Sequence, residues 1–167
     1  MGAAYRFMKK VLPIVTQEKA IAVPQGEQIL PPRITFIDVH FSSDRQSEFD
    51  MMDDYDAFCF YRALFERASN FTTLAENNIN GGTECNGITE LIFGTKNGKK
   101  IYVCVDGGYP VPEVADTEMY TEDCSEELIQ EIVIAVEQFF EITIAEQKCI
   151  PMWGNAHILH LYEAPSQ

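Results

Sequence analysis

Residues 88–105 read ITELIFGTKNGKKIYVCV and carry the clearest structural signal in the chain. Two apolar runs flank the dipeptide Asn97-Gly98. Both of these residues tolerate positive φ, as a type I′ turn requires, so the stretch predicts a β-hairpin. Residues 101–105 are apolar on both faces, which predicts a central strand with a helix against at least one face.

One helix is expected on each side of this hairpin. Before it, apolar side chains recur at steps of three and four from the region 50–54 to about Asn70, which predicts an amphipathic helix. After it, a similar apolar stripe predicts a second helix that runs to about Ala145. Ser125 or Asp123 can cap the first turn of that helix.

The remaining segments predict strands and loops in one small domain. Strands are expected at residues 5–15, 18–24, 33–41 and 156–163, and loops at 77–87 and 109–123. A chain of 167 residues fits a single domain, here residues 1–167. The order of elements predicts an α+β fold, with a mostly antiparallel sheet of about five or six strands and two main helices on one face.

Negative charge is concentrated in one part of the chain. The formal net charge is -14, and residues 101–147 hold twelve carboxylates and no Lys or Arg. Such a surface repels nucleic acid and anionic membranes and attracts basic proteins, so no direct binding of nucleic acid or membrane is expected. The odd number of cysteines, without a C-x-x-C pair, favours reduced thiols and a cytoplasmic location.

The charge pattern predicts an acidic binding protein rather than an enzyme. It would inhibit or neutralise a partner with a basic surface, such as a nuclease or another nucleic-acid-binding protein, as inhibitors, antidotes, and immunity or counter-defence proteins do. The expected partner-binding residues are Glu113, Asp116, Glu118, Glu122, Asp123, Glu126, Glu127 and Glu131. A secondary acidic cluster could extend this face: Asp50, Asp53, Asp54 and Asp56. This hypothesis expects no catalytic residue, no cofactor and no metal.

The sequence also leaves open three alternatives to this binding hypothesis. The acidic residues could be a solvated surface without a partner. A small hydrolase-like or metal-dependent enzyme could use Asp38, His40 and either His157 or His160, but a zinc site would require adjacent strands. His157 and His160 themselves lie three apart in a predicted strand and so face opposite sides. The third alternative is a structural subunit of a homo-oligomer that pairs through the apolar stripe of the second helix.

Overall fold

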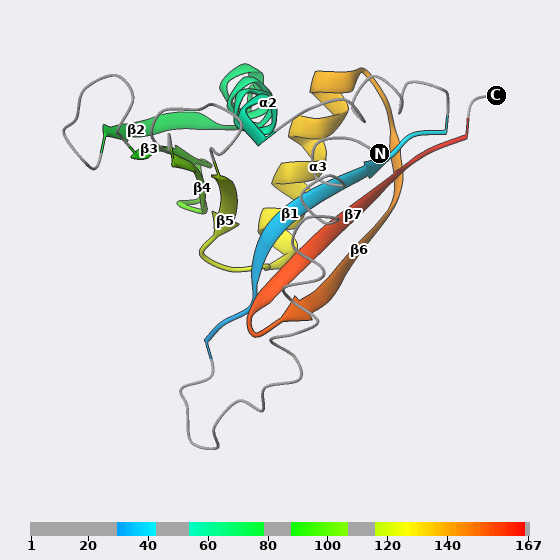
Figure 1. Cartoon of the computed structure of the whole chain (residues 1–167). Coiled ribbons are helices and arrows are strands. Elements are labelled where there is room, and N and C mark those ends of the chain that lie inside the picture. Colours follow the sequence, from blue (N-terminus) through cyan, green and yellow to red (C-terminus); the bar gives the residue numbers. More distant parts are fainter. Residues whose placement is uncertain (1–29, 43–53, 79–87, 107–115, 166–167) are drawn as a thin grey trace.

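The computed structural model describes residues 30–42, 54–78, 88–106 and 116–165. Within these ranges the chain forms seven strands and two helices (Figure 1). In order they are β1 (Arg33–His40), α2 (Asp54–Arg67), β2 (Thr72–Asn78), β3 (Ile88–Gly94), β4 (Lys100–Asp106), β5 (Asp116–Thr121), α3 (Glu126–Phe140), β6 (Ile144–Trp153) and β7 (Ala156–Glu163). Neither described helix has the length and apolar character needed to cross a membrane.

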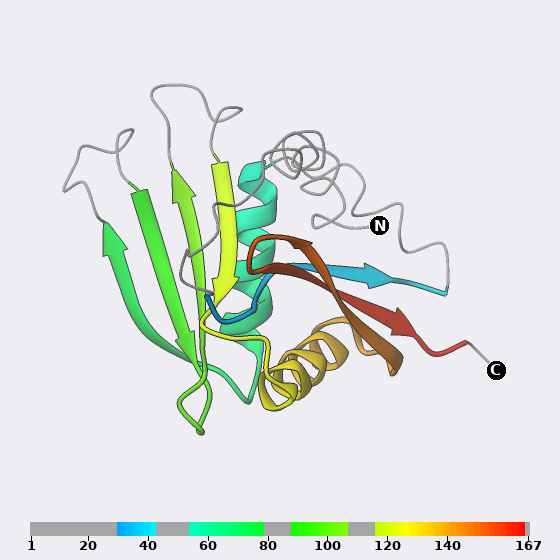
Figure 2. The same cartoon turned by 90° about the horizontal axis from the view of Figure 1, so that it is seen from below.

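The strands form two sheets, not one. The first is antiparallel with the order β2-β3-β4-β5, and the second has the order β1-β7-β6. In the second sheet β6 and β7 are antiparallel, whereas β1 and β7 are parallel. Figure 2 shows α2 against the four-stranded sheet and α3 beside the three-stranded sheet. The α+β class and the mostly antiparallel pairing are confirmed, but the prediction of a single sheet with both helices on one face is wrong.

The predicted hairpin is confirmed as β3–β4, with a different turn. Gly98 has a φ of 82°, and Asn97 is not among the described residues with positive φ. The Thr95 amide donates to the Lys99 carbonyl at 2.9 Å, and the Gly98 amide donates to the Thr95 carbonyl at 3.1 Å. This pattern fits a three-residue loop that ends in a left-handed glycine, instead of a type I′ turn. As predicted, β4 is a central strand.

The sequence patterns miss three strands. The segment Thr72–Asn78 forms β2, and part of the expected loop 109–123 forms β5. The second helix ends at Phe140, because Glu141 adopts a left-handed conformation with a φ of 55°, and β6 follows. The strands expected at residues 5–15 and 18–24 lie outside the described residues.

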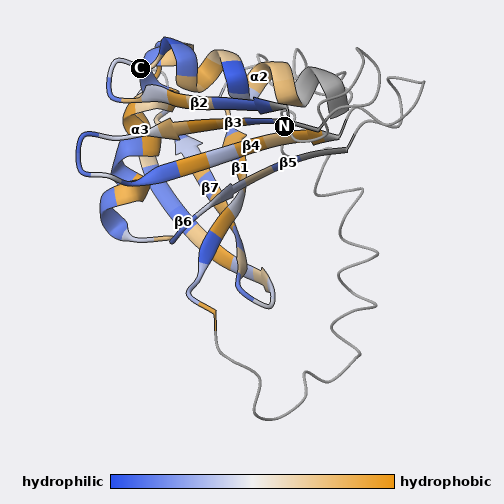
Figure 3. Ribbon diagram, turned by 90° about the vertical axis from the view of Figure 1, so that its left-hand side faces the viewer, coloured by the Kyte–Doolittle hydropathy of each residue, from blue (hydrophilic) through white to orange (hydrophobic). Residues whose placement is uncertain are grey.

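Both helices bury their apolar stripes in one core. The most buried members are Tyr61, Leu64 and Phe65 of α2 and Leu128, Ile132 and Val136 of α3. Burying a large apolar side chain contributes about 1.5–3 kcal/mol, so these positions stabilise the fold strongly. Figure 3 shows hydrophobic and hydrophilic residues alternating along strands, as half-buried sheets require. The stripe of α3 is inside its own chain, so it does not offer the surface on which the homo-oligomer alternative relied.

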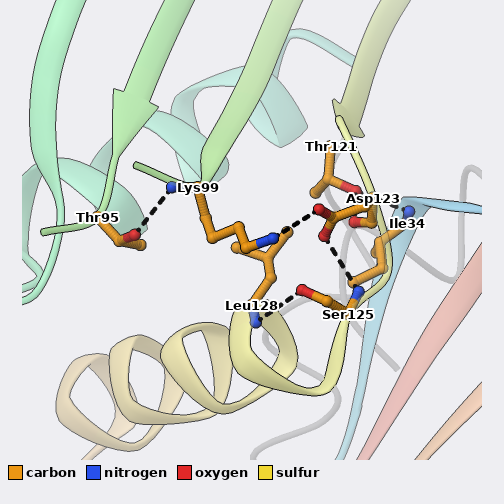
Figure 4. Close-up of polar contacts among 7 residues, drawn as sticks. All are labelled: Ile34, Thr95, Lys99, Thr121, Asp123, Ser125 and Leu128. Carbon is orange, nitrogen blue, oxygen red and sulfur yellow. Dashed lines mark hydrogen bonds and ion pairs between the residues drawn. The ribbon is translucent and has the colours of Figure 1, made fainter. Parts of the chain in front are cut away.

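A buried hydroxyl joins the two sheets at the start of α3. Thr121, at the end of β5, is 1% exposed. Its Oγ1 accepts a hydrogen bond from the Ile34 amide at 2.9 Å and donates to the Asp123 carbonyl at 2.5 Å (Figure 4). Ser125 then caps α3 by accepting a hydrogen bond from the Leu128 amide at 3.3 Å. One side chain therefore connects β1, β5 and the entry to α3.

Replacing this hydroxyl should destabilise the protein more than its size suggests. The nearly isosteric change Thr121→Val leaves the buried Ile34 amide without its acceptor, so the free energy of unfolding should fall by about 1–3 kcal/mol. Denaturant unfolding followed by circular dichroism measures this loss. Thr143→Val, at an exposed threonine, is the matched control and should have little effect. Equal effects of the two changes would contradict the role of Thr121.

Candidate functional site

The parallel pairing of β1 and β7 brings three polar side chains together, which we call the Asp38 cluster: Asp38, His40 and His160. Asp38 lies opposite His160 in the register of the two strands. His40 Nε2 lies 3.0 Å from His160 Nδ1 and 3.2 Å from Asp38 Oδ2. His160 Nδ1 lies 3.4 Å from the same carboxylate oxygen. Three potential ligand atoms from two strands therefore converge.

Asp38 is the unusual member of this cluster. Its side chain is 1% exposed, its Oδ1 has no hydrogen-bond partner among the described residues, and its Oδ2 has only the two imidazole nitrogens close by. Removing a carboxylate from water costs several kcal/mol unless a cation or hydrogen-bond donors replace the lost solvation. Either a proton on one of the two imidazoles or a metal ion could provide that compensating charge.

The environment of His160 favours its neutral form. Burial lowers the pKa of His160, the Asp38 carboxylate opposes this effect, and nearby His40 and Lys148 lower the pKa further. A neutral imidazole keeps one ring nitrogen free to accept a proton or bind a metal. His160 is therefore suited to act as a ligand at neutral pH.

The distances in the Asp38 cluster agree with the edges of a metal coordination shell. Ligand atoms at the usual 2.0–2.2 Å from zinc are separated by roughly 3.3 Å in a tetrahedron and roughly 3 Å in an octahedron. The three observed separations are 3.0, 3.2 and 3.4 Å. A single ion can therefore contact all three atoms with little rearrangement. Among the described residues this is the group of His, Cys, Asp and Glu side chains that could hold a metal.

One side of the Asp38 cluster is accessible. The His40 side chain is 30% exposed, compared with 13% for His160. The Tyr162 ring stacks on the His40 ring with centroids 4.4 Å apart, and the Lys148 ammonium lies 5.6 Å from the Tyr162 centroid. These contacts restrict the orientation of His40 while leaving it open to solvent.

His157 does not join this cluster. Its Nδ1 lies 3.0 Å from the carbonyl oxygen of Asn155, in the turn between β6 and β7. Strand alternation puts it on the opposite face of β7 from His160, as the three-residue spacing predicted. All three residues of the Asp38 cluster are candidates from the sequence, but only the pairing of β1 with β7 shows that His160, and not His157, lies beside Asp38 and His40.

The acidic residues expected to bind a partner are partly engaged within the chain. Lys99 pairs with Asp123 at 2.8 Å and Lys100 with Glu122 at 3.8 Å. Glu131 accepts a hydrogen bond of 2.6 Å from Asn70 Nδ2. These carboxylates therefore have partners within the chain, which compensate part of their negative charge.

Three other members are exposed: Glu118, Glu126 and Glu127. No Lys or Arg of the described ranges forms an ion pair with them. Glu126 and Glu127 begin α3, where the helix dipole favours negative charge. Glu113, Asp50 and Asp53 lie outside the described residues. For Asp116, Asp54 and Asp56, only the backbone is described, in β5 and at the start of α2.

A small hollow of about 120 Å³ lies between α2 and α3, and it is lined by Leu64, Arg67, Ala68, Ala135, Gln138 and Phe139. Small-molecule sites usually have volumes of about 300–1,000 Å³, so this hollow is too small to be a strong candidate. It includes no member of the Asp38 cluster, which we prefer on chemical grounds.

Comparison with known proteins provides no family assignment: no protein-family model, curated protein or solved structure matches the chain.

The ion pair of Asp123 has a measurable pH dependence. Burial raises the pKa of Asp123, but hydrogen bonds from Lys99 and Ser125 outweigh burial and hold the pKa below its usual range. Asp123 should therefore stabilise the fold above about pH 4, and this contribution should be lost as the pH falls through the lowered pKa.

The variant Asp123→Asn isolates this contribution. The difference in unfolding free energy between wild type and variant should be less than about 1 kcal/mol at neutral pH, because the pair is partly exposed, and it should vanish in acid. Denaturant titrations at several pH values measure it. Glu118→Gln removes an exposed carboxylate and is the control. A difference that stays constant from neutral to acid pH would contradict the assignment.

Proposed function

We propose that the protein binds a divalent transition-metal ion through Asp38 Oδ2, His40 Nε2 and His160 Nδ1. One observation carries this proposal: a buried carboxylate, whose Oδ1 has no hydrogen-bond partner among the described residues, holds its Oδ2 within 3.4 Å of two imidazole nitrogens. A metal ion would satisfy all three groups at once. The acidic chain, with a net charge of -14, also attracts cations in general.

The type of ligand narrows the choice of metal. Two imidazoles and one carboxylate suit Zn²⁺ or Fe²⁺, whereas Ca²⁺ and Mg²⁺ prefer shells of oxygen ligands. Either ring nitrogen of histidine can bind zinc, so the use of Nε2 from His40 and Nδ1 from His160 is chemically ordinary. Zinc is therefore the first ion to test.

Three protein ligands leave at least one coordination position for water. Zinc bound in this way can lower the pKa of a water molecule to about 7, which is the basis of many hydrolytic enzymes. The 30% exposure of His40 supports access of a small substrate from that side. The alternative from the sequence, a metal-dependent enzyme, thus gains support in a narrower form that uses His160 and not His157.

Metal titration tests the proposal directly. Metal-free protein should bind about one equivalent of Zn²⁺ by calorimetry. His160→Ala or Asp38→Asn should weaken the affinity more than about tenfold, since each removes a ligand. Zinc at about 100 times its dissociation constant should stabilise the wild type by roughly 2.7 kcal/mol, because it binds only the folded chain.

His157→Ala is the matched control, because it removes a histidine from the same strand but outside the cluster. It should bind zinc like the wild type. Circular dichroism of each variant verifies folding. Wild-type protein that binds no zinc, or that loses affinity equally in His157→Ala and His160→Ala, would refute the proposal.

We also propose that a basic protein docks onto the acidic surface formed by Glu118, Glu126 and Glu127. Its specific support is the exposure of Glu118, Glu126 and Glu127, none of which forms an ion pair with Lys or Arg in the described part of the chain. Electrostatic attraction of this kind accelerates association and weakens as salt increases. A nuclease or another nucleic-acid-binding protein has the basic surface that such docking requires.

Neutral substitutions test whether this surface has a special role. The triple variant Glu118→Gln, Glu126→Gln and Glu127→Gln should bind a lysine-rich peptide on the order of tenfold more weakly at low salt. Fluorescence anisotropy measures the affinity. The control triple variant Glu66→Gln, Glu141→Gln and Glu146→Gln has the same net charge and alters exposed carboxylates elsewhere. Equal weakening by both variants would indicate general charge attraction only.

A further inference from the structure

Two cysteines meet where α3 begins. Cys124 directly precedes the cap residue Ser125, and Cys149 lies within β6. Both side chains are half-buried against the core and both thiols are free. The Cys149 thiol is a hydrogen-bonding neighbour of Cys124.

The packing of β6 against α3 explains this proximity. Gln147 is two residues before Cys149, so the two side chains share one face of the strand. Gln147 Nε2 donates to Glu126 Oε1 at 3.4 Å, and Gln130 Nε2 donates to Gln147 Oε1 at 3.3 Å. The face of β6 that carries Cys149 is therefore the face that contacts the first turns of α3, next to Cys124.

We propose that Cys124 and Cys149 are an oxidisable pair that closes into an intrachain disulfide. The oxidant is a small disulfide such as oxidised glutathione. The Cys124 thiolate attacks one sulfur of the oxidant, whose S–S bond breaks, and one glutathione thiol leaves. Cys149 then loses its proton to solvent and attacks the Cys124 sulfur, which releases the second glutathione. Two cysteine thiols are oxidised, and one glutathione disulfide is reduced to two thiols.

The environment of Cys149 determines the order of these steps. Burial, followed by the neighbouring Cys124 thiol, raises the pKa of Cys149 to about 12. Cys149 is therefore a poor first nucleophile at neutral pH, which leaves the first attack to Cys124. The closing step should become faster as the pH rises, because it requires the Cys149 thiolate.

The bond would connect β6 to the segment that caps α3. It would close a loop that contains all of α3 (Glu126–Phe140) and would restrict that loop in the unfolded chain. This inference is independent of the proposed metal site, because neither cysteine belongs to the Asp38 cluster.

The experiment uses the full chain under native conditions. Reduced protein is incubated with mixtures of oxidised and reduced glutathione, alkylated, digested without reduction and analysed by mass spectrometry. The linked peptide pair should contain Cys124 and Cys149. A variant with Cys59, Cys85 and Cys104 changed to serine should give the same link. Cys149→Ser should stop at the glutathione adduct of Cys124, and Cys124→Ser should leave Cys149 unmodified.

Two results would overturn the proposal. One is wild-type protein that carries only glutathione adducts at Cys124 and Cys149. The other is a disulfide that joins either residue to a different cysteine. Both are measured on the wild type, so poor folding of a variant does not affect the conclusion.

Discussion

The parallel pairing of β1 with β7 is the constraint on which the candidate site depends. His40 and His160 are 120 positions apart in the chain, and only this pairing brings them together. Its register is maintained by buried apolar partners on the other face, where Ile37 lies opposite Leu159 and Val39 opposite Leu161. A slip by one residue would move Asp38 into the apolar core, which is energetically prohibitive for a carboxylate. Hydrophobic packing on one face of the sheet thus specifies the polar geometry on the other.

The acidic segment, residues 101–147, also meets local structural needs. Glu126 and Glu127 lie in the first turn of α3, where the positive end of the helix dipole favours negative side chains. Asp123 and Glu122 pair with lysines next to the β3–β4 turn. Glu137 accepts a hydrogen bond of 2.9 Å from the Ile144 amide, where the chain leaves α3 and enters β6. Much of the charge that suggests a binding surface therefore also stabilises helix ends and turns. Among the described residues, Glu118, Glu126 and Glu127 are exposed and form no ion pair with Lys or Arg.

Local patterns were sufficient for some elements and not for others. The stripes of α2 and α3, the β3–β4 hairpin and the strand β7 could be predicted, because each has a complete hydrophobic period and a recognisable boundary. The strand β5 falls in a segment that the sequence predicts as a loop, because the segment is short and rich in acids, and among its described side chains only Met119 and Thr121 are buried. The first residues of strand β6 fall within the predicted helix, because the left-handed turn at Glu141 has no glycine to signal the end of that helix. The residues of the Asp38 cluster were recognised as candidates, but their convergence depends on strand order, which single-sequence patterns do not contain.

Two amides of β1 donate to side chains of distant elements: Ile34 to Thr121 and Ile37 to the Tyr61 hydroxyl, at 2.9 and 3.5 Å. Because β1 is an edge strand, such amides could otherwise recruit a strand from another molecule. Thr121 and Tyr61 belong to the part of the protein built around the four-stranded sheet, so these bonds break when the two sheets separate. Hydrogen–deuterium exchange at Ile34 and Ile37 would therefore report how often the two halves of the molecule open, separately from the fraying of either sheet.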